Sequence, residues 1–420
     1  MFKKFILGSG LLFIVLVLLA IVFRNQIILH IYYSRLEPPE NVQKIPLPKL
    51  DPALEKELTD YLKAHFQTPE DYVISKFSDH DIVFLGEIHR LLHDVLLVQR
   101  LIPILYKKHI YNLGMEFANY RDQPLIDSLL EAPAYDAALV NKILFNCEVD
   151  WGYQEYADLF KVAWQLNQSL PDTAPRFRIV GLNDFEDWSY VKTKEDLNNP
   201  QIMAKVFPEG RSGDRFMANV VLKEFVNKKH KALIYCGMHH AFTRFFQPIS
   251  SPDGGFVRFI KNRMGNIVYQ AIGRRAMTIS LHFPWDGSYE VNWEQVYPAD
   301  GAIDALMHKL GPDFYPVGFD TRTTPFGKLS CETSVYHYGY DHLTLADFCD
   351  GYIFTKPISQ YRNVHHIKGF INKNNVELAR LRLSSLELKN NFLWKILSPS
   401  TIDSMMFSDA LVKPWVVYFY

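Results

Sequence analysis

Short apolar runs of strand length alternate with longer amphipathic stretches along most of this chain of 420 residues. The runs lie at residues 82–85, 112–115, 177–182, 232–236, 277–283, 315–319 and 352–355. Most are separated by stretches long enough for helices, such as 91–108, 153–170 and 214–229. Continuous apolar strands between helices are typical of a parallel sheet covered on both faces. We therefore predict an α/β fold whose mostly parallel central sheet is flanked by helices.

Ahead of this pattern, residues 5–23 form an uncharged apolar run, and a helix of about 20 apolar residues crosses a bilayer. Lys3 and Lys4 precede the run, which predicts a cytoplasmic amino terminus and a periplasmic or extracellular globular part. A cleaved signal peptide is the alternative. The run is longer than the roughly 7–15 residues of a signal-peptide core, and no A-x-A site closes it. We expect one transmembrane helix, so that the lipid bilayer is a partner.

Composition divides the chain and limits its function. We predict a membrane anchor at 1–35, a proline-rich linker with a short helix at 36–77, an α/β domain at 78–365 and a carboxyl-terminal appendage at 366–420. In the linker, Asp51 and Pro52 predict the start of a helix that runs to about residue 66. A formal net charge of -1 argues against a nucleic-acid partner. The 4 cysteines form no CxxC pair, which excludes a cysteine-built metal site.

Polar residues follow four of the apolar runs, usually with a glycine beside them. The successive run ends carry Glu87 and His89, then Glu116, then Asn183 and Asp184, then His239 and His240. In open α/β sheets, ligands bind outside the carboxyl ends of the strands. These side chains are therefore expected to meet at one edge of the sheet and to form a site.

The chemistry of this set leaves alternatives open. Carboxylates and imidazoles suit zinc, manganese or iron, but a histidine oriented by a glutamate can also activate water without metal. Glu87 alone could instead cap a helix, and Glu116 could pair with Arg121. Of the adjacent His239 and His240, one is expected to be structural. His93, one helical turn after His89, is a weaker candidate and fits a helix-surface or supporting residue better.

Several familiar signatures are absent from the sequence. It contains no HExxH, no Walker loop, no GxGxxG after a strand and no GxSxG elbow. These absences argue against a standard zincin, a P-loop nucleotidase, a dinucleotide enzyme and an ordinary serine hydrolase.

The order of these motifs resembles the Tiki/erythromycin-esterase/ChaN-like superfamily. The similar segments are I-V-F-L-G-E-I-H at 82–89 with Gln99, G-M-E-F at 114–117, Trp151 with Tyr156, Asn183, D-R-F-M-A-N at 214–219 and L-I-Y-C-G-M-H-H at 233–240. The likeness spans roughly residues 78 to 283. Carried over, the family's GE-x-H pair falls on Glu87 and His89, its second acid on Glu116 and its late histidine on His240.

The resemblance implies a site and a fold more directly than a substrate, because the superfamily includes metal-dependent peptidases, macrolide esterases and haem-binding proteins of iron uptake. The chain departs from the esterase pattern at two positions. Ile88 stands where esterases have a threonine, and Gly213 stands where they have an arginine. Arg211 and Arg215 are the nearby arginines that could replace it.

These observations predict a membrane-anchored, extracytoplasmic hydrolase of a small-molecule or peptide substrate, acting on an ester or peptide bond. Glu87, His89, Glu116 and His240 are the predicted catalytic residues and, if a divalent metal takes part, its ligands. Asn183, His239 and Arg215 are expected to bind substrate or cofactor. The alternative is a non-catalytic haem- or metal-binding protein of iron uptake, for which the 23 Tyr and 30 Phe leave room for an axial ligand and an apolar pocket.

Overall fold

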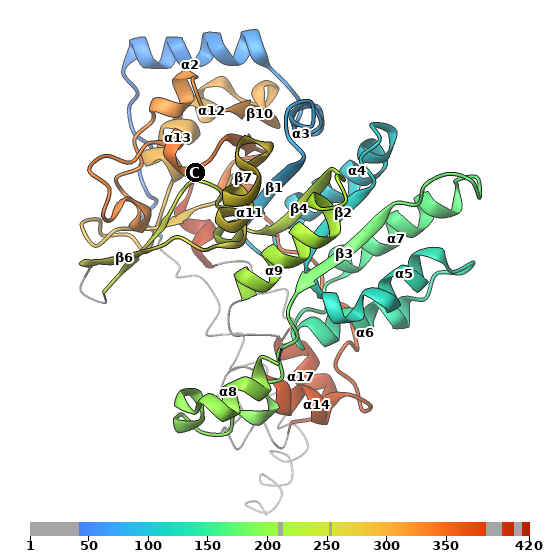
Figure 1. Cartoon of the computed structure of the whole chain (residues 1–420). Helices are drawn as coiled ribbons and strands as arrows, with labels where there is room; N and C mark the ends of the chain where they lie inside the picture. The colour runs from blue at the N-terminus through green and yellow to red at the C-terminus, as the bar shows by residue number, and fades with distance from the viewer. Residues whose placement is uncertain (1–41, 209–212, 252–253, 384–396, 407–413) are drawn as a thin grey trace, which may run out of the picture.

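The computed structural model of the chain describes residues 42–208, 213–251, 254–383, 397–406 and 414–420 (Figure 1). The predicted transmembrane helix at 5–23 lies outside these residues. Among the helices that are described, none combines the length and apolar character needed to span a bilayer.

Seven strands form one sheet in the order β10-β11-β7-β1-β4-β2-β3. Their bounds are β1 Ile82–Glu87, β2 Asn112–Asn119, β3 Arg178–Asn183, β4 Ala232–Gly237, β7 Ala276–Leu281, β10 Val317–Asp320 and β11 Gly351–Phe354. Each strand arises from one of the predicted apolar runs. Neighbouring strands are parallel except β10, which runs antiparallel to β11. The predicted α/β fold with a mostly parallel sheet is confirmed.

Helices surround this sheet, and two small hairpins lie outside it. The helices are α2 Pro52–His65, α3 Pro69–Lys76, α4 Leu92–Lys107, α5 Gln123–Glu131, α6 Ala137–Cys147, α7 Gln154–Gln168, α8 Pro200–Val206, α9 Gly213–Val221, α10 Met238–Ala241, α11 Met264–Ile272, α12 Ala302–Leu310, α13 Leu345–Phe348, α14 Val376–Arg382 and α17 Pro399–Met406. The hairpins pair β5 Gln247–Ser250 with β6 Phe256–Ile260, and β8 Trp285–Asp286 with β9 Gln295–Val296.

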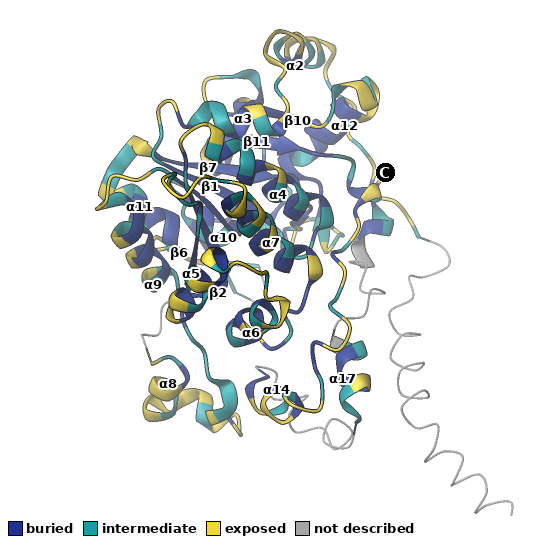
Figure 2. Ribbon diagram, turned by 90° about the vertical axis from the view of Figure 1, so that its right-hand side faces the viewer, coloured by how far each residue is buried: buried dark blue, intermediate teal, exposed yellow. Residues whose placement is uncertain are grey.

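Alternate residues of each central strand enter two separate cores. Val83 and Leu85 of β1 belong to the core that α4 and α7 complete, whereas Ile82 and Phe84 belong to the core on the side of α9 and α11. Successive side chains of a strand point to opposite faces, so a strand that is apolar throughout must be covered twice. Figure 2 shows the result, with buried strands at the centre and exposed residues on outer helices such as α8.

Local signals account for the helix boundaries that were predicted. The Asp51 carboxylate accepts hydrogen bonds from the backbone of Ala53 and Leu54, which fixes the start of α2. The stretch predicted as one helix at 214–229 is instead α9 followed by a π-helical turn at Leu222–Val226. Such turns occur mostly as single insertions in α-helices.

The segment after residue 366 packs on the α/β core. Phe370, Ile371 and Val376 are buried in the same core as α4 and α7. The Asp403 carboxylate accepts hydrogen bonds from the backbone N–H groups of Gly369 and Ile371, each at 2.7 Å. These contacts connect α17 to the chain that precedes α14.

Candidate functional site

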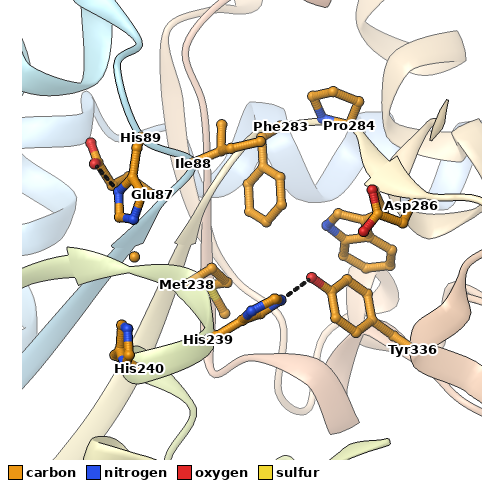
Figure 3. A pocket seen from close by; sticks show the side chains of 12 residues that line it. Glu87, Ile88, His89, Met238, His239, His240, Phe283, Pro284, Asp286 and Tyr336 are labelled. Atoms are coloured by element: carbon orange, nitrogen blue, oxygen red, sulfur yellow. Dashed lines mark hydrogen bonds and ion pairs between the residues drawn. The ribbon is translucent and has the colours of Figure 1, made fainter. Parts of the chain in front are cut away.

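The carboxyl ends of three adjacent strands position the predicted site. Glu87 ends β1, Glu116 lies near the end of β2, and β4 leads directly into α10, which carries His239 and His240. Next to these ends is a cavity of about 200 Å³ (Figure 3). Its lining residues are Glu87, Ile88, His89, Gly237, Met238, His239, His240, Phe283, Pro284, Trp285, Asp286 and Tyr336.

Glu87 and His89 form a hydrogen-bonded pair on one side of the cavity. His89 Nδ1 lies 2.9 Å from Glu87 Oε1, and the Glu87 side chain is fully buried while that of His89 is 39% exposed. Two tyrosines complete the surroundings of the carboxylate, since Tyr156 donates to Oε1 at 2.8 Å and Tyr235 donates to Oε2. A carboxylate oxygen only accepts, so Nδ1 of His89 is the donor, and Nε2 is the ring nitrogen that faces away from Glu87.

His240 lies between two carboxylates. Its Nε2 is 3.3 Å from Glu116 Oε1, and its Nδ1 is 2.7 Å from Asp214 Oδ1 on α9. Both carboxylates are also held by the backbone, because Gly237 N–H donates to Glu116 Oε2 at 2.7 Å and Met264 N–H donates to Asp214 Oδ1 at 2.8 Å. The three side chains therefore form one ion-paired group across β2, α10 and α9.

This arrangement controls the protonation of all three groups. Burial lowers the pKa of His240, but the charges of Glu116 and Asp214 outweigh it and raise that pKa to about 10. Burial raises the pKa of Glu116, yet the His240 and His89 charges and the Gly237 N–H bring it down to about 2. The pKa of Asp214 is lowered for the same reason, through His240 and Arg263. At neutral pH the group is an imidazolium between two carboxylates.

His239 has different surroundings from its neighbour. Its Nε2 lies 2.8 Å from the Tyr336 hydroxyl and 3.4 Å from Gln247 Nε2. Burial, together with the nearby Arg263 charge, lowers the pKa of His239 to about 4. Figure 3 shows the His239–Tyr336 pair across the cavity from Glu87 and His89. His239 is thus a neutral polar group of the cavity wall.

Gly237 lies where the Glu87–His89 pair meets the ion-paired group of Glu116, His240 and Asp214. A Cβ at this position would lie 2.7 Å from His89 Cε1, 3.1 Å from His89 Nε2 and 3.5 Å from Glu116 Oε2. Its backbone angles, φ -56° and ψ 143°, are open to any residue, so the requirement for glycine is one of space. The imidazole of His89 and the carboxylate of Glu116 approach each other across this glycine.

Three predicted residues lie elsewhere. Asn183, at the end of β3, lines a second cavity of about 150 Å³ with Glu148, Asp150 and Glu186, and its Nδ2 contacts Cys147 Sγ at 3.7 Å. Arg215 is exposed on α9 and does not line the cavity of His89. His93 is buried in α4 against the Tyr361 ring, with centroids 4.4 Å apart. Of the residues predicted to bind substrate or cofactor, only His239 lines this cavity, together with Glu87, His89 and His240 of the predicted catalytic set.

The predicted metal ligands are arranged as pairs rather than around a shared point. Glu87 accepts from His89 and two tyrosines, and both ring nitrogens of His240 face carboxylates. Across the described part of the chain, no group of three or more His, Cys, Asp or Glu side chains is placed to hold a metal ion. As placed, these donors do not fit a divalent metal.

Residues 73–183 match the family model described as haem-binding uptake, Tiki superfamily, ChaN. The resemblance to the Tiki/ChaN superfamily is confirmed. The matched Tiki/ChaN segment contains Glu87, His89 and Glu116, whereas Asp214 and His240 lie after it. No curated protein matches the chain.

Solved structures of low sequence identity are also similar to the chain. A succinoglycan biosynthesis protein is 11% identical, with a TM-score of 0.49, over 73% of this chain and 98% of its own. A mutant of the erythromycin esterase EreC in its open conformation is 10% identical, with a TM-score of 0.40, over 75% and 97% of the two chains. ChaN of Campylobacter jejuni, solved with cofacially bound haem, is 15% identical, with a TM-score of 0.30, over 53% and 88%.

Sequence reasoning missed the partners that hold the predicted residues. Arg211 lies outside the described residues, and the arginine that pairs with Asp214 is Arg263, whose Nη1 is 2.9 Å from Asp214 Oδ2. Asp214 stood in the D-R-F-M-A-N segment that resembles the superfamily, so its position was visible although its role was not. Tyr235 likewise stood in the L-I-Y-C-G-M-H-H segment, but nothing there pointed to its contact with Glu87. Arg263 gave no signal, because nothing in the sequence relates it to Asp214, 49 positions away.

Proposed function

We propose that the chain is a hydrolase of ester or peptide bonds, anchored by an amino-terminal transmembrane helix with its globular part outside the cytoplasm. The observation that carries the proposal is the meeting of two different groups over Gly237. One is His89 oriented by buried Glu87, and the other is ionised Glu116 held by His240. The apolar run at 5–23 and the two preceding lysines support the anchoring.

In the proposed reaction, His89 acts as a general base on water. Its Nε2 takes a proton while the water oxygen bonds to the substrate carbonyl carbon and an electron pair moves onto the carbonyl oxygen. When the intermediate collapses, the bond to the leaving oxygen or nitrogen breaks, and His89 returns the proton to that leaving group. Glu87 keeps the imidazole in the required tautomer and stabilises its charged form, as a buried carboxylate does in other histidine-based sites.

Glu116 is proposed to hold the attacking water. Its low pKa keeps it a hydrogen-bond acceptor at every ordinary pH, and it approaches the same point above Gly237 as His89 Nε2. His240 does not take up the water proton, because it is already protonated below about pH 10. It acts as a positioning residue that fixes the Glu116 carboxylate. The facing wall of Phe283, Trp285 and Tyr336 would contact the substrate on its apolar side.

The test uses the purified full-length chain and three substrates: an aryl acetate, an acyl peptide and a macrolide lactone. His89→Gln and Glu116→Gln are each expected to lower kcat/KM on the hydrolysed substrate by about 10²-fold or more, since general-base catalysis is worth roughly 10²–10⁴. His342→Gln is the matched control, because His342 is 62% exposed and pairs with Glu332 away from the cavity. Equal rates in all three variants would contradict the proposal.

Metal removal provides a separate prediction. Because the site side chains bind one another rather than a common ion, dialysis of the full-length chain against a chelator is expected to leave the rate within about twofold. A loss of activity that zinc or manganese restores would contradict the metal-free chemistry and return Glu87, His89, Glu116 and His240 to the role of ligands.

The matched family model favours haem binding as a second candidate. The imidazole of His89 lines the cavity and is 39% exposed, against 24% for His240, and a histidine can serve as an axial ligand of haem iron. A cavity of about 200 Å³ is below the roughly 300–1,000 Å³ of ordinary ligand pockets, so a porphyrin would lie at its mouth. If the second candidate is correct, haemin added to the full-length chain gives a Soret band that His89→Gln removes and His342→Gln keeps.

A further inference from the structure

A third cavity lies at the opposite end of the sheet from His89. Its volume is about 440 Å³, within the usual range of small-molecule pockets, and it is lined by His80, Arg244, Tyr269, Arg274, Ala276, Met277, Arg322, Thr323 and Asp350. His80 lies just before β1, and Ala276 begins β7, whereas Glu87 ends β1. At about 3.3 Å per residue, the length of β1 separates this cavity from the catalytic candidates by roughly 15 Å or more.

The residues that line this cavity carry a net positive charge. Three of its lining residues are arginines and one is an aspartate, so the formal charge is 3 - 1 = +2 with His80 neutral. Asp350 Oδ1 lies 3.2 Å from Arg244 Nε and 3.3 Å from Arg322 Nη1, while Oδ2 accepts from Thr278 N–H at 2.9 Å and Thr243 Oγ1 at 3.3 Å. Both oxygens of the Asp350 carboxylate therefore already have two partners each.

The guanidinium groups of Arg274 and Arg322 have nitrogens that can bind a ligand in this cavity. The side chain of Arg274 makes no ion pair or hydrogen bond with any described residue, and Arg322 uses one of its nitrogens on Asp350. Arg244 is held in place by Asp350 and by the Ala346 carbonyl, 3.0 Å from its Nη2. Arginines from three separate segments thus converge on one hollow with a surplus of two positive charges. Guanidinium forks of this kind match the oxygens of a phosphate group.

We propose that this cavity binds a small phosphorylated molecule. Its phosphate dianion would be held by Arg274 and Arg322, with Arg244 as the fixed member of the set. The phosphate would leave most of the volume to the organic part of the ligand, which would contact Tyr269 and Met277. The proposal is independent of the hydrolase site, because no residue lines both cavities.

The experiment is a titration of the purified full-length chain with inorganic pyrophosphate at constant ionic strength, followed by calorimetry and by the shift in melting temperature. Arg274→Gln and Arg322→Gln are each expected to weaken binding at least tenfold. Arg275→Gln is the matched control, because Arg275 is the next residue, carries the same charge and pairs with Asp81 at 2.9 Å outside the cavity. It should bind as the unsubstituted chain does.

Three outcomes would overturn the proposal. They are no saturable binding of pyrophosphate, an equal loss in Arg275→Gln, and binding confined to phosphatidylcholine vesicles that contain phosphatidic acid. The second would mean that only the general positive charge matters. The third would assign the arginines to a lipid headgroup rather than to a free phosphorylated ligand.

Discussion

His239 and His240 are neighbours in the chain, yet their surroundings give them different protonation states near neutral pH. His240 faces two carboxylates and has a pKa of about 10, whereas His239 is half-buried, faces a tyrosine hydroxyl and has a pKa of about 4. A protonated histidine makes a poor base, and an unprotonated one cannot complete an ion pair. At the scale of single residues, this difference assigns His240 to holding Glu116 and His239 to the cavity wall.

The ion-paired group makes stability depend on pH in a definite direction. The pKa of His240 rises from 6.5 in the unfolded chain to about 10, so its contribution is complete below pH 6.5 and is lost as the pH rises through 10. The pKa of Glu116 falls from 4.5 to about 2, so its contribution is complete above pH 4.5 and is lost as the pH falls through 2. We expect the group to stabilise the fold most between about pH 4.5 and 6.5.

Asp214→Asn tests this prediction. The change removes one of the two carboxylates of His240, so the free energy of unfolding at pH 6 should fall by about 1–3 kcal/mol, the usual range for a buried charged hydrogen bond. The loss should shrink as the pH approaches 10, and urea titrations at pH 6, 8 and 10 would measure it. Asp172→Asn, at a fully exposed residue, is the control. An unchanged pH profile in Asp214→Asn would show that Asp214 does not raise the pKa of His240.

At the scale of elements, the junction of β4 and α10 brings the two halves of the site together. β4 lies between β1 and β2, so its end reaches both the Glu87–His89 pair and Glu116. Gly237 is the last residue of β4 and has no side chain to keep them apart. The close approach of His89 and Glu116 therefore depends on one missing methyl group.

Gly237→Ala should damage activity more than stability. The added Cβ would lie 2.7 Å from His89 Cε1, which forces the imidazole to move, and a displacement of about 1 Å can cost 10²-fold in rate. Crowding of this kind typically costs about 1–3 kcal/mol of stability. The measurements are kcat/KM and the urea midpoint. In Gly213→Ala the added Cβ meets nothing within 4 Å, so this variant should keep both values, and equal effects of the two substitutions would count against the close approach.

At the scale of the whole molecule, the carboxyl-terminal residues pack against segments from distant parts of the chain. Ile45 N–H donates to the Tyr418 carbonyl at 2.8 Å, and Phe419 is fully buried in a small core with Tyr297 and Val416. Ile358 and Tyr361, which follow β11, belong to the same core, as does Leu91 at the start of α4. Segments far apart in the sequence thus share one apolar cluster, which connects the last residues to the sheet.

Phe419→Ala is expected to destabilise the whole domain by about 3–5 kcal/mol, the usual cost of removing a buried phenylalanine. Tyr420→Ala, at a residue that is 49% exposed, should change the free energy of unfolding by less than about 1 kcal/mol. Urea denaturation followed by far-ultraviolet circular dichroism would measure both. A small separate transition in Phe419→Ala, with the main transition unmoved, would show that this cluster does not fold together with the sheet.

The elements that the sequence predicted best are the strands of the sheet. All seven came from apolar runs of four to seven residues, because a strand buried on both faces must be apolar throughout. The hairpins β5–β6 and β8–β9 were missed, since β6 is largely exposed and β8 has only two residues. The proposed anchor and the segment boundaries remain predictions.

The sequence by itself determined which residues stand at the ends of the strands, because the periodicity that marks a strand also marks where it stops. Only the tertiary structure decided how those residues pair and which of them carry a proton. It separated Asn183 from the others, brought Arg263 to Asp214, and left His240 charged beside a neutral His239. Periodicity is a property of neighbouring residues, whereas a pKa depends on every charge within a few ångströms, and those charges come from distant parts of the chain.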